Sequence, residues 1–141
     1  MRQAGTPTAN LGQGVGVFWD YYKLSPATYP WIRWGNAVPF GKWKDLEPSE
    51  GSYYWTDLEV YLDHCIAVGK KAVLRHFFNR EESPAWLFNN YADARLAMVN
   101  MSGFVPAYNN GTLRAKLSNF LTAFAAWANG LSAARKAVII H

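Results

Sequence analysis

The distribution of hydrophobic and polar residues along the chain predicts an alternation of strands and helices. Short apolar runs at 14–19, 37–41 and 71–77 are typical of buried strands. Between the second and third runs, residues 56–68 carry apolar side chains at helical spacing, namely Leu58, Tyr61, Leu62, Cys65 and Val68. A strand, a helix and another strand in this order predict a parallel βαβ unit, because parallel strands need a crossover connection.

The ends of the predicted helices carry recognisable signals. Thr56 and Glu59 have the spacing of a capping box, and Gly69 is typical of a helix stop. A second, longer helix is predicted over 112–128, with an apolar face made of Leu113, Leu117, Phe120, Leu121, Phe124 and Trp127. The segment 78–105 is predicted to be irregular with a short helical turn or two, and connections of this length are usually functional.

The apolar run 136–141 predicts a fourth strand at the end of the chain. A parallel strand needs neighbours at its edges and helices on its faces, so this ending predicts a longer parent protein. A full (β/α)8 barrel has eight strands and ~250 residues. The predicted fold is therefore α/β, a partial (β/α)8 TIM barrel of about the first four strand–helix units. We expect 1–141 to form a single truncated TIM-barrel domain, the N-terminal half, in which 1–13 are irregular.

Composition narrows the class of partner. Half of the 141 residues are hydrophobic and 16% are aromatic, including seven Trp, and exposed aromatic rings suit the flat apolar faces of sugars. The net charge is +4, but the basic residues are dispersed without a known spacing motif, so no nucleic acid is expected. No apolar stretch reaches the roughly 18 residues of a membrane span and no signal peptide is visible, so no membrane is expected. The cellular location stays unknown, and secretion of the longer parent protein stays open.

No cofactor and no metal site are expected. Gly12 and Gly14 lack the third glycine of the dinucleotide fingerprint, because Val17 occupies its position. His64 lies beside Cys65 without a third ligand at metal spacing.

Four segments in a fixed order resemble the β-galactosidase-like glycoside hydrolases. The first is a Trp-x-x-Leu-Glu-Pro-x-x-Gly motif at 43–51, and the others are 69–76, 84–87 and 105–108. The resemblance implies retaining hydrolysis of O-glycosidic bonds by two glutamates, at strands four and seven of the barrel. Retaining chemistry needs two carboxyl groups ~5–5.5 Å apart. No Asp or Glu follows Asp93, so no catalytic residue is predicted in this chain, which is expected to be inactive as given.

Five residues are candidates to contact a carbohydrate. Arg75 and His76 end the third predicted strand, where barrel sites lie, although strand alternation points only one of them inward and either could anchor a neighbouring loop instead. Trp43 and Trp86 are candidates to stack on sugar rings, with core packing as the alternative. Asn79, in the loop after the strand, is the fifth candidate.

The acidic residues near these candidates are interpreted as structural. Glu47 and Glu50 flank a proline in a loop, where the usual role is to stabilise a turn. Glu81 and Glu82 are adjacent, which is typical of solvated charge.

The predicted function is therefore a fragment of a carbohydrate-active, glycoside-hydrolase-like barrel that contributes part of a sugar-binding mouth. The expected partner is an oligo- or polysaccharide. The alternative is a non-catalytic carbohydrate-binding or structural barrel, because fold alone does not establish function. Open sheet edges also predict self-association.

Overall fold

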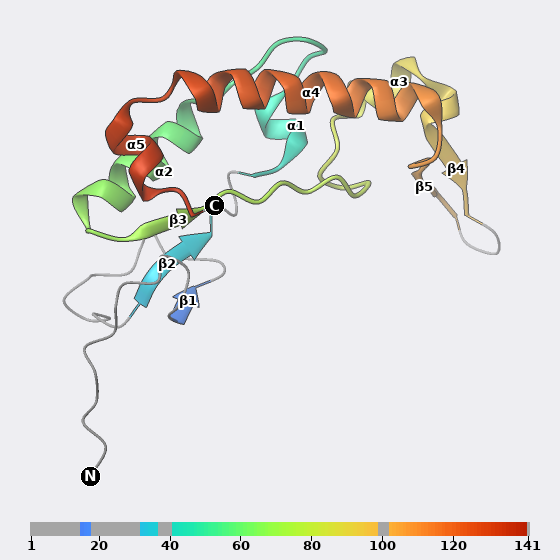
Figure 1. Ribbon diagram of the computed structural model, residues 1–141. Coiled ribbons are helices and arrows are strands. Elements are labelled where there is room, and N and C mark those ends of the chain that lie inside the picture. The colour runs from blue at the N-terminus through green and yellow to red at the C-terminus, as the bar shows by residue number, and fades with distance from the viewer. Residues whose placement is uncertain (1–14, 18–31, 37–40, 99–101, 141) are drawn as a thin grey trace.

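The computed structural model describes residues 15–17, 32–36, 41–98 and 102–140 (Figure 1). Three short strands form a parallel sheet in the order β1–β2–β3, with bounds Val15–Val17, Ile32–Asn36 and Lys71–Val73. In the register of β2 and β3, Gly35 lies opposite Ala72. The predicted irregular segment 1–13 lies outside the described residues.

Two helices connect β2 to β3. These are α1, Trp43–Leu46, and α2, Thr56–Ala67, which buries its predicted apolar face in the core. The predicted parallel strand–helix–strand unit is confirmed, since β2 and β3 pair in parallel. Its first strand is β2 at 32–36 instead of the predicted run at 37–41, of which 37–40 lie outside the described residues.

The predicted capping box of α2 is wrong. The N-cap residue is Trp55, whose side chain makes no cap hydrogen bond, and Thr56 is already the first helical residue. Glu59 instead accepts hydrogen bonds from Trp127 Nε1 at 3.0 Å and from Arg135 Nη1 at 2.7 Å. A charged guanidinium is a stronger partner for this carboxylate than a backbone amide, so a tertiary contact replaces the local one.

The long helix α4, Gly111–Gly130, confirms the predicted helix at 112–128 and extends it at both ends. Its N-cap is Asn110, whose Oδ1 accepts from the amides of Thr112 and Leu113 at 2.7 and 3.2 Å. Figure 1 shows α4 running from the hairpin β4–β5 across α1 to the region of α2 and α5. One helix therefore bridges the two ends of the described structure.

The predicted irregular segment contains more regular structure than expected. It forms α3, Ala85–Asn90, which confirms a short helix, then a 3-10 turn at Ala92–Ala94. An unpredicted hairpin follows, in which β4, Arg95–Ala97, pairs antiparallel with β5, Phe104–Pro106. Strands of three residues are too short for the alternation of apolar and polar residues that would predict them.

The predicted fourth strand and the partial barrel are both wrong. Residues Ala133–Val138 form helix α5, and the chain then meets the sheet at one isolated bridge between Ile139 and Ala72, where the amide of Ile140 donates to the Ala72 carbonyl at 2.9 Å. Arg135 on this helix pairs with Glu59 and Asp63 of α2, both at 2.7 Å, so α5 is held against α2. The described residues therefore form a small α/β domain with a three-stranded parallel sheet and a hairpin, and they do not form four strand–helix units.

Candidate functional site

The Trp-x-x-Leu-Glu-Pro-x-x-Gly motif is held together by a hydrogen-bond network centred on Glu47. Glu47 is only 2% exposed, and its Oε2 accepts from Trp43 Nε1 at 2.6 Å. Its Oε1 accepts from the amide of Gly51 at 2.8 Å, and its carbonyl accepts from Trp86 Nε1 at 2.9 Å. Hydrogen bonds to both carboxylate oxygens offset the cost of burying the charge. The motif thus holds the loop after α1 and ties it to α3, in agreement with the structural interpretation of Glu47.

The two candidate tryptophans lie in different positions. Trp43 is fully buried, and its ring packs against Phe78, Trp86 and Phe120 at centroid distances of 5.9, 6.2 and 5.5 Å. Its faces are therefore covered by protein in this conformation. Trp86 is partly exposed, with its indole N–H donated to Glu47. Trp43 forms the base of this region and Trp86 lies nearer its surface.

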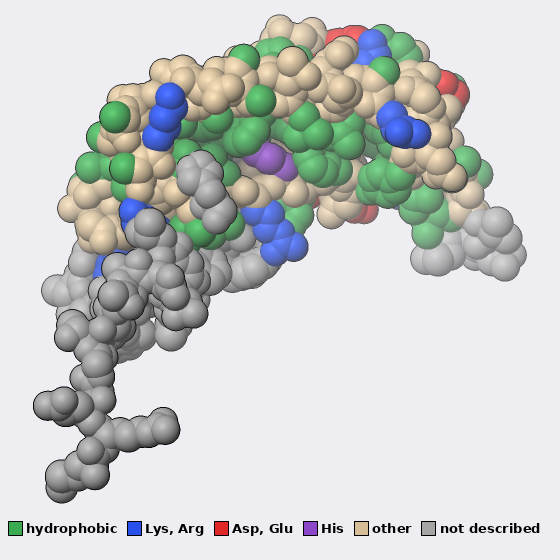
Figure 2. Space-filling model, in the orientation of Figure 1, with side chains coloured by type: hydrophobic (Ala, Val, Ile, Leu, Met, Phe, Trp, Pro, Cys, Tyr) green, Lys and Arg blue, Asp and Glu red, His purple; other side chains and the backbone are tan. Residues whose placement is uncertain are grey.

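Arg75 and His76 lie after β3, which ends at Val73, so the prediction that they end this strand is wrong, and they point to different environments. Arg75 is exposed, with its guanidinium carbon 5.0 Å from the centre of the Phe77 ring. His76 turns inward, where its ring lies 4.3 Å from Phe124 and 5.5 Å from Phe120. Figure 2 shows hydrophobic side chains gathered beneath α4 with a histidine among them.

The environment of His76 decides its protonation. Burial lowers the pKa of His76, although the hydrogen bond with the Gly41 carbonyl acts in the opposite direction. Nδ1 lies 3.3 Å from the Gly41 carbonyl, which can only accept, so Nδ1 carries the proton. Nε2 is then an acceptor, and it is buried without a hydrogen-bond partner in the described part of the chain.

Gly41 makes this arrangement possible. A Cβ atom at position 41 would lie 1.8 Å from the carbonyl oxygen of Arg75, so only glycine lets the two segments approach this closely. The amide of Phe77 donates to the Gly41 carbonyl at 3.2 Å, which joins the segments after β2 and β3.

Asn79 holds the next turn of the chain. Its Oδ1 accepts from the amide of Glu82 at 2.9 Å, and its carbonyl accepts from the amide of Ser83 at 2.9 Å. The same residue lines a hollow of about 250 Å³ between this turn and the hairpin. Sequence reasoning missed the other residues of this hollow, Tyr108 in particular, because they come from distant segments.

Several of the carboxylates that the structure describes are paired with cations. Glu50 is 2.6 Å from Lys116 Nζ, and Glu82 is 3.3 Å from Nζ of both Lys42 and Lys44. Every described carboxyl with a shifted pKa has it lowered, chiefly by hydrogen bonds: the set is Glu50, Glu59, Asp63 and Asp93. A general acid needs a raised pKa instead. The residues described also contain no group of His, Cys, Asp and Glu that could hold a metal ion.

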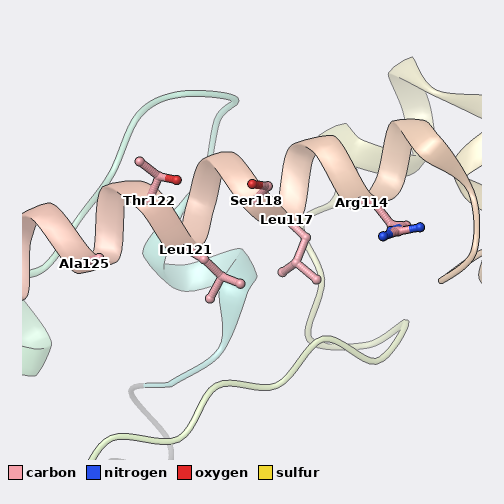
Figure 3. Close-up of a pocket in the computed structure, with 6 residues that line it drawn as sticks. All are labelled: Arg114, Leu117, Ser118, Leu121, Thr122 and Ala125. Carbon is pink, nitrogen blue, oxygen red and sulfur yellow. The ribbon is translucent and has the colours of Figure 1, made fainter.

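A second hollow, of about 480 Å³, lies along α4 and is drawn in Figure 3. Its lining residues are Arg114, Leu117, Ser118, Leu121, Thr122 and Ala125. Leu121 is 42% exposed, although the helical pattern assigned it to the buried face.

Within the described ranges, no helix is long and apolar enough to cross a membrane.

Comparison with solved structures shows a similarity of fold. No family model matches the sequence, and no curated protein matches it. A solved structure of β-galactosidase from the psychrophilic Marinomonas ef1 is similar to this chain, with a TM-score of 0.63 and 18% sequence identity. The similarity covers 80% of this chain and 19% of the β-galactosidase chain, so this chain spans about a fifth of that protein. At this identity the similarity establishes a shared fold only.

Proposed function

We propose that this chain is a glycoside-hydrolase-related fragment that contacts carbohydrate through Arg75 and His76, after β3. The observation that carries the proposal is the fold similarity over 80% of the chain to a β-galactosidase. The motif order noted in the sequence points in the same direction. The ligand we propose is a β-galactoside or a longer oligo- or polysaccharide, in keeping with the name of the similar structure.

The chemistry of these two side chains suits a sugar. Sugar sites combine apolar and aromatic walls with a few polar groups that bind hydroxyls. Arg75 is exposed and carries a guanidinium, which donates hydrogen bonds, while His76 beside it contributes a partly exposed ring. Asn79 and Trp86, on the following segment and on α3, are the further contacts we propose. Trp43 is buried beneath them and is proposed to support the site.

We place glycosidic bond hydrolysis outside these 141 residues. The resemblance implies catalytic glutamates at strands four and seven of a barrel, whereas the described residues form only a three-stranded parallel sheet and a two-stranded hairpin. The second candidate function is carbohydrate binding without catalysis, because fold alone does not establish function. The two candidates share the contacts at Arg75 and His76 and differ only in what the parent protein does with the bound sugar.

The test is a titration of the full chain with methyl β-galactoside and with a β-linked galacto-oligosaccharide, followed by NMR. We expect Arg75→Ala to weaken binding about ten- to a hundredfold, because hydrogen bonds to a charged group are worth about 1.5–3 kcal/mol. Lys136→Ala is the control, since Lys136 is also an exposed cation and lies on α5, outside the proposed contacts. Equal affinity of wild type and Arg75→Ala would refute the proposed contact.

A further inference from the structure

The hollow between the loop after β3 and the hairpin is built from segments far apart in sequence. We name it the hairpin hollow and define it by its lining residues, Asn79, Arg80, Glu81, Met98, Phe104, Val105, Pro106 and Tyr108. Its volume is about 250 Å³, which is small enough for one ring of a small ligand and too small for a folded segment of protein.

Tyr108 provides an exposed and oriented aromatic surface. Its side chain is 52% exposed, and its hydroxyl donates to the carbonyl of Phe78 at 2.9 Å. Burial and the charge of Glu81 raise the pKa of Tyr108, so the hydroxyl keeps its proton at neutral pH and the hydrogen bond persists. The ring is therefore held from one end while part of its surface stays open, an arrangement suited to stacking against a flat apolar group.

Phe104 has a different role, because its ring already has neighbours. The guanidinium of Arg80 lies 4.6 Å from its centre, and Phe88 packs edge-on at 4.9 Å. Gly103 makes room for this arginine, since a Cβ atom at that position would lie 2.6 Å from Arg80 Nη1. Gly103 also has φ 122°, which L side chains rarely adopt. The hairpin thus positions Arg80 at the hollow.

The polar wall is ordered before any ligand arrives. The backbone amide of Lys44 donates to the carbonyl of Glu82 at 2.9 Å. The side-chain Nζ of Lys44 donates to the carbonyl of Glu81 at 2.6 Å. The turn itself is closed by the hydrogen bonds of Asn79 described above. A preordered wall reduces the entropy that binding would otherwise cost.

We propose that the hairpin hollow binds one neutral sugar ring, which stacks on Tyr108 and bonds through its hydroxyls to Asn79, Arg80 and Glu81. The wall offers one positive and one negative side chain together with an amide, which matches the mixed donors and acceptors of a polyol. Glu81 opposes an anionic ligand, and three polar side chains would be poorly satisfied by a purely apolar one.

This inference rests on the proposed function and names its ligand more closely. Arg75 and Asn79 are four residues apart, so their Cα atoms are at most ~14 Å from each other. Figure 1 shows the segment after β3 running beneath α4 toward α3. A short oligosaccharide bound along this segment could contact both places, whereas a monosaccharide would occupy only one. An oligosaccharide is therefore the ligand proposed to contact both places.

The test compares Tyr108→Ala with Tyr54→Ala, a matched control because Tyr54 is 47% exposed. We expect Tyr108→Ala to weaken binding of the β-linked galacto-oligosaccharide about three- to tenfold, the worth of an aromatic contact, and Tyr54→Ala to leave it unchanged. Glu81→Gln, at an exposed side chain, is a second variant if Tyr108→Ala does not fold, and it should weaken binding in the same direction. Circular dichroism establishes that each variant is folded.

The outcomes separate the two proposals. Weakening by both Tyr108→Ala and Arg75→Ala supports both. Weakening by Arg75→Ala alone overturns the sugar site in the hairpin hollow and leaves the proposed function standing. Weakening by Tyr108→Ala alone supports the hairpin hollow and overturns the contact at Arg75. If the wild-type chain binds neither sugar, both proposals are overturned.

Discussion

The hydrogen-bond network around Glu47 predicts that replacing this residue lowers the stability of the fold. Replacing Glu47 by alanine leaves the indole N–H of Trp43, a fully buried residue, without its acceptor at 2.6 Å. An unsatisfied buried donor costs about 1–3 kcal/mol. The amide of Gly51 also loses its acceptor, but Gly51 is exposed and water can replace the carboxylate, so this loss adds about 0.5–1.5 kcal/mol.

The expected total for Glu47→Ala is therefore about 1.5–4.5 kcal/mol, a large fraction of the about 5–15 kcal/mol by which domains are stable. At roughly 4 °C per kcal/mol for a chain of this size, Tm should fall by about 6–18 °C. Thermal unfolding followed by circular dichroism and tryptophan fluorescence measures this shift. Glu81→Ala, which removes an exposed carboxylate from the same region, is the control and should change Tm by less than about 2 °C. If Glu47→Ala and Glu81→Ala have the same Tm, the hydrogen-bond network around Glu47 does not stabilise the fold.

Two further predictions concern Gly41 and His76, which lie on either side of the contact between the segments after β2 and β3. Gly41→Ala should lower the free energy of unfolding by about 3 kcal/mol or more, because its Cβ would lie 1.8 Å from the Arg75 carbonyl oxygen. Gly111→Ala, whose Cβ would have nothing within 4 Å, should be tolerated; similar urea-unfolding midpoints of the two variants would contradict the close approach at Gly41. Because burial holds the pKa of His76 below its unfolded value of about 6.5, the folded state binds fewer protons and stability should fall as pH drops from about 6.5 toward the folded pKa. His76→Phe should show a smaller loss between pH 7.5 and 5.5 in the same unfolding assay, and an unchanged loss would mean that His76 is not the group responsible.

Several features were readable from local sequence because local physics determines them. The helices α2 and α4 have long apolar faces at helical spacing, and the parallel pairing of β2 with β3 follows from a helical crossover. The structural role of Glu47 was also predictable, since its partners Trp43 and Gly51 lie four residues away on either side.

Other features depended on contacts between distant residues. The run at 136–141 is apolar enough for a strand, but Arg135 pairs with Glu59 and Asp63, which are 76 and 72 residues away, and the region becomes helix α5. The hairpin hollow depends on Tyr108 reaching Phe78 across 30 residues, for which no short-range pattern exists.

The chain by itself thus determined where its long helices lie and how its motif holds together, because spacing and neighbouring partners are local quantities. Only the tertiary structure decided that the last apolar run is helical, that His76 points inward while Arg75 stays exposed, and that a hollow forms beside the hairpin. Each of these outcomes depends on which distant surfaces meet, and the free energy of those contacts exceeds the small local preferences of the segments involved.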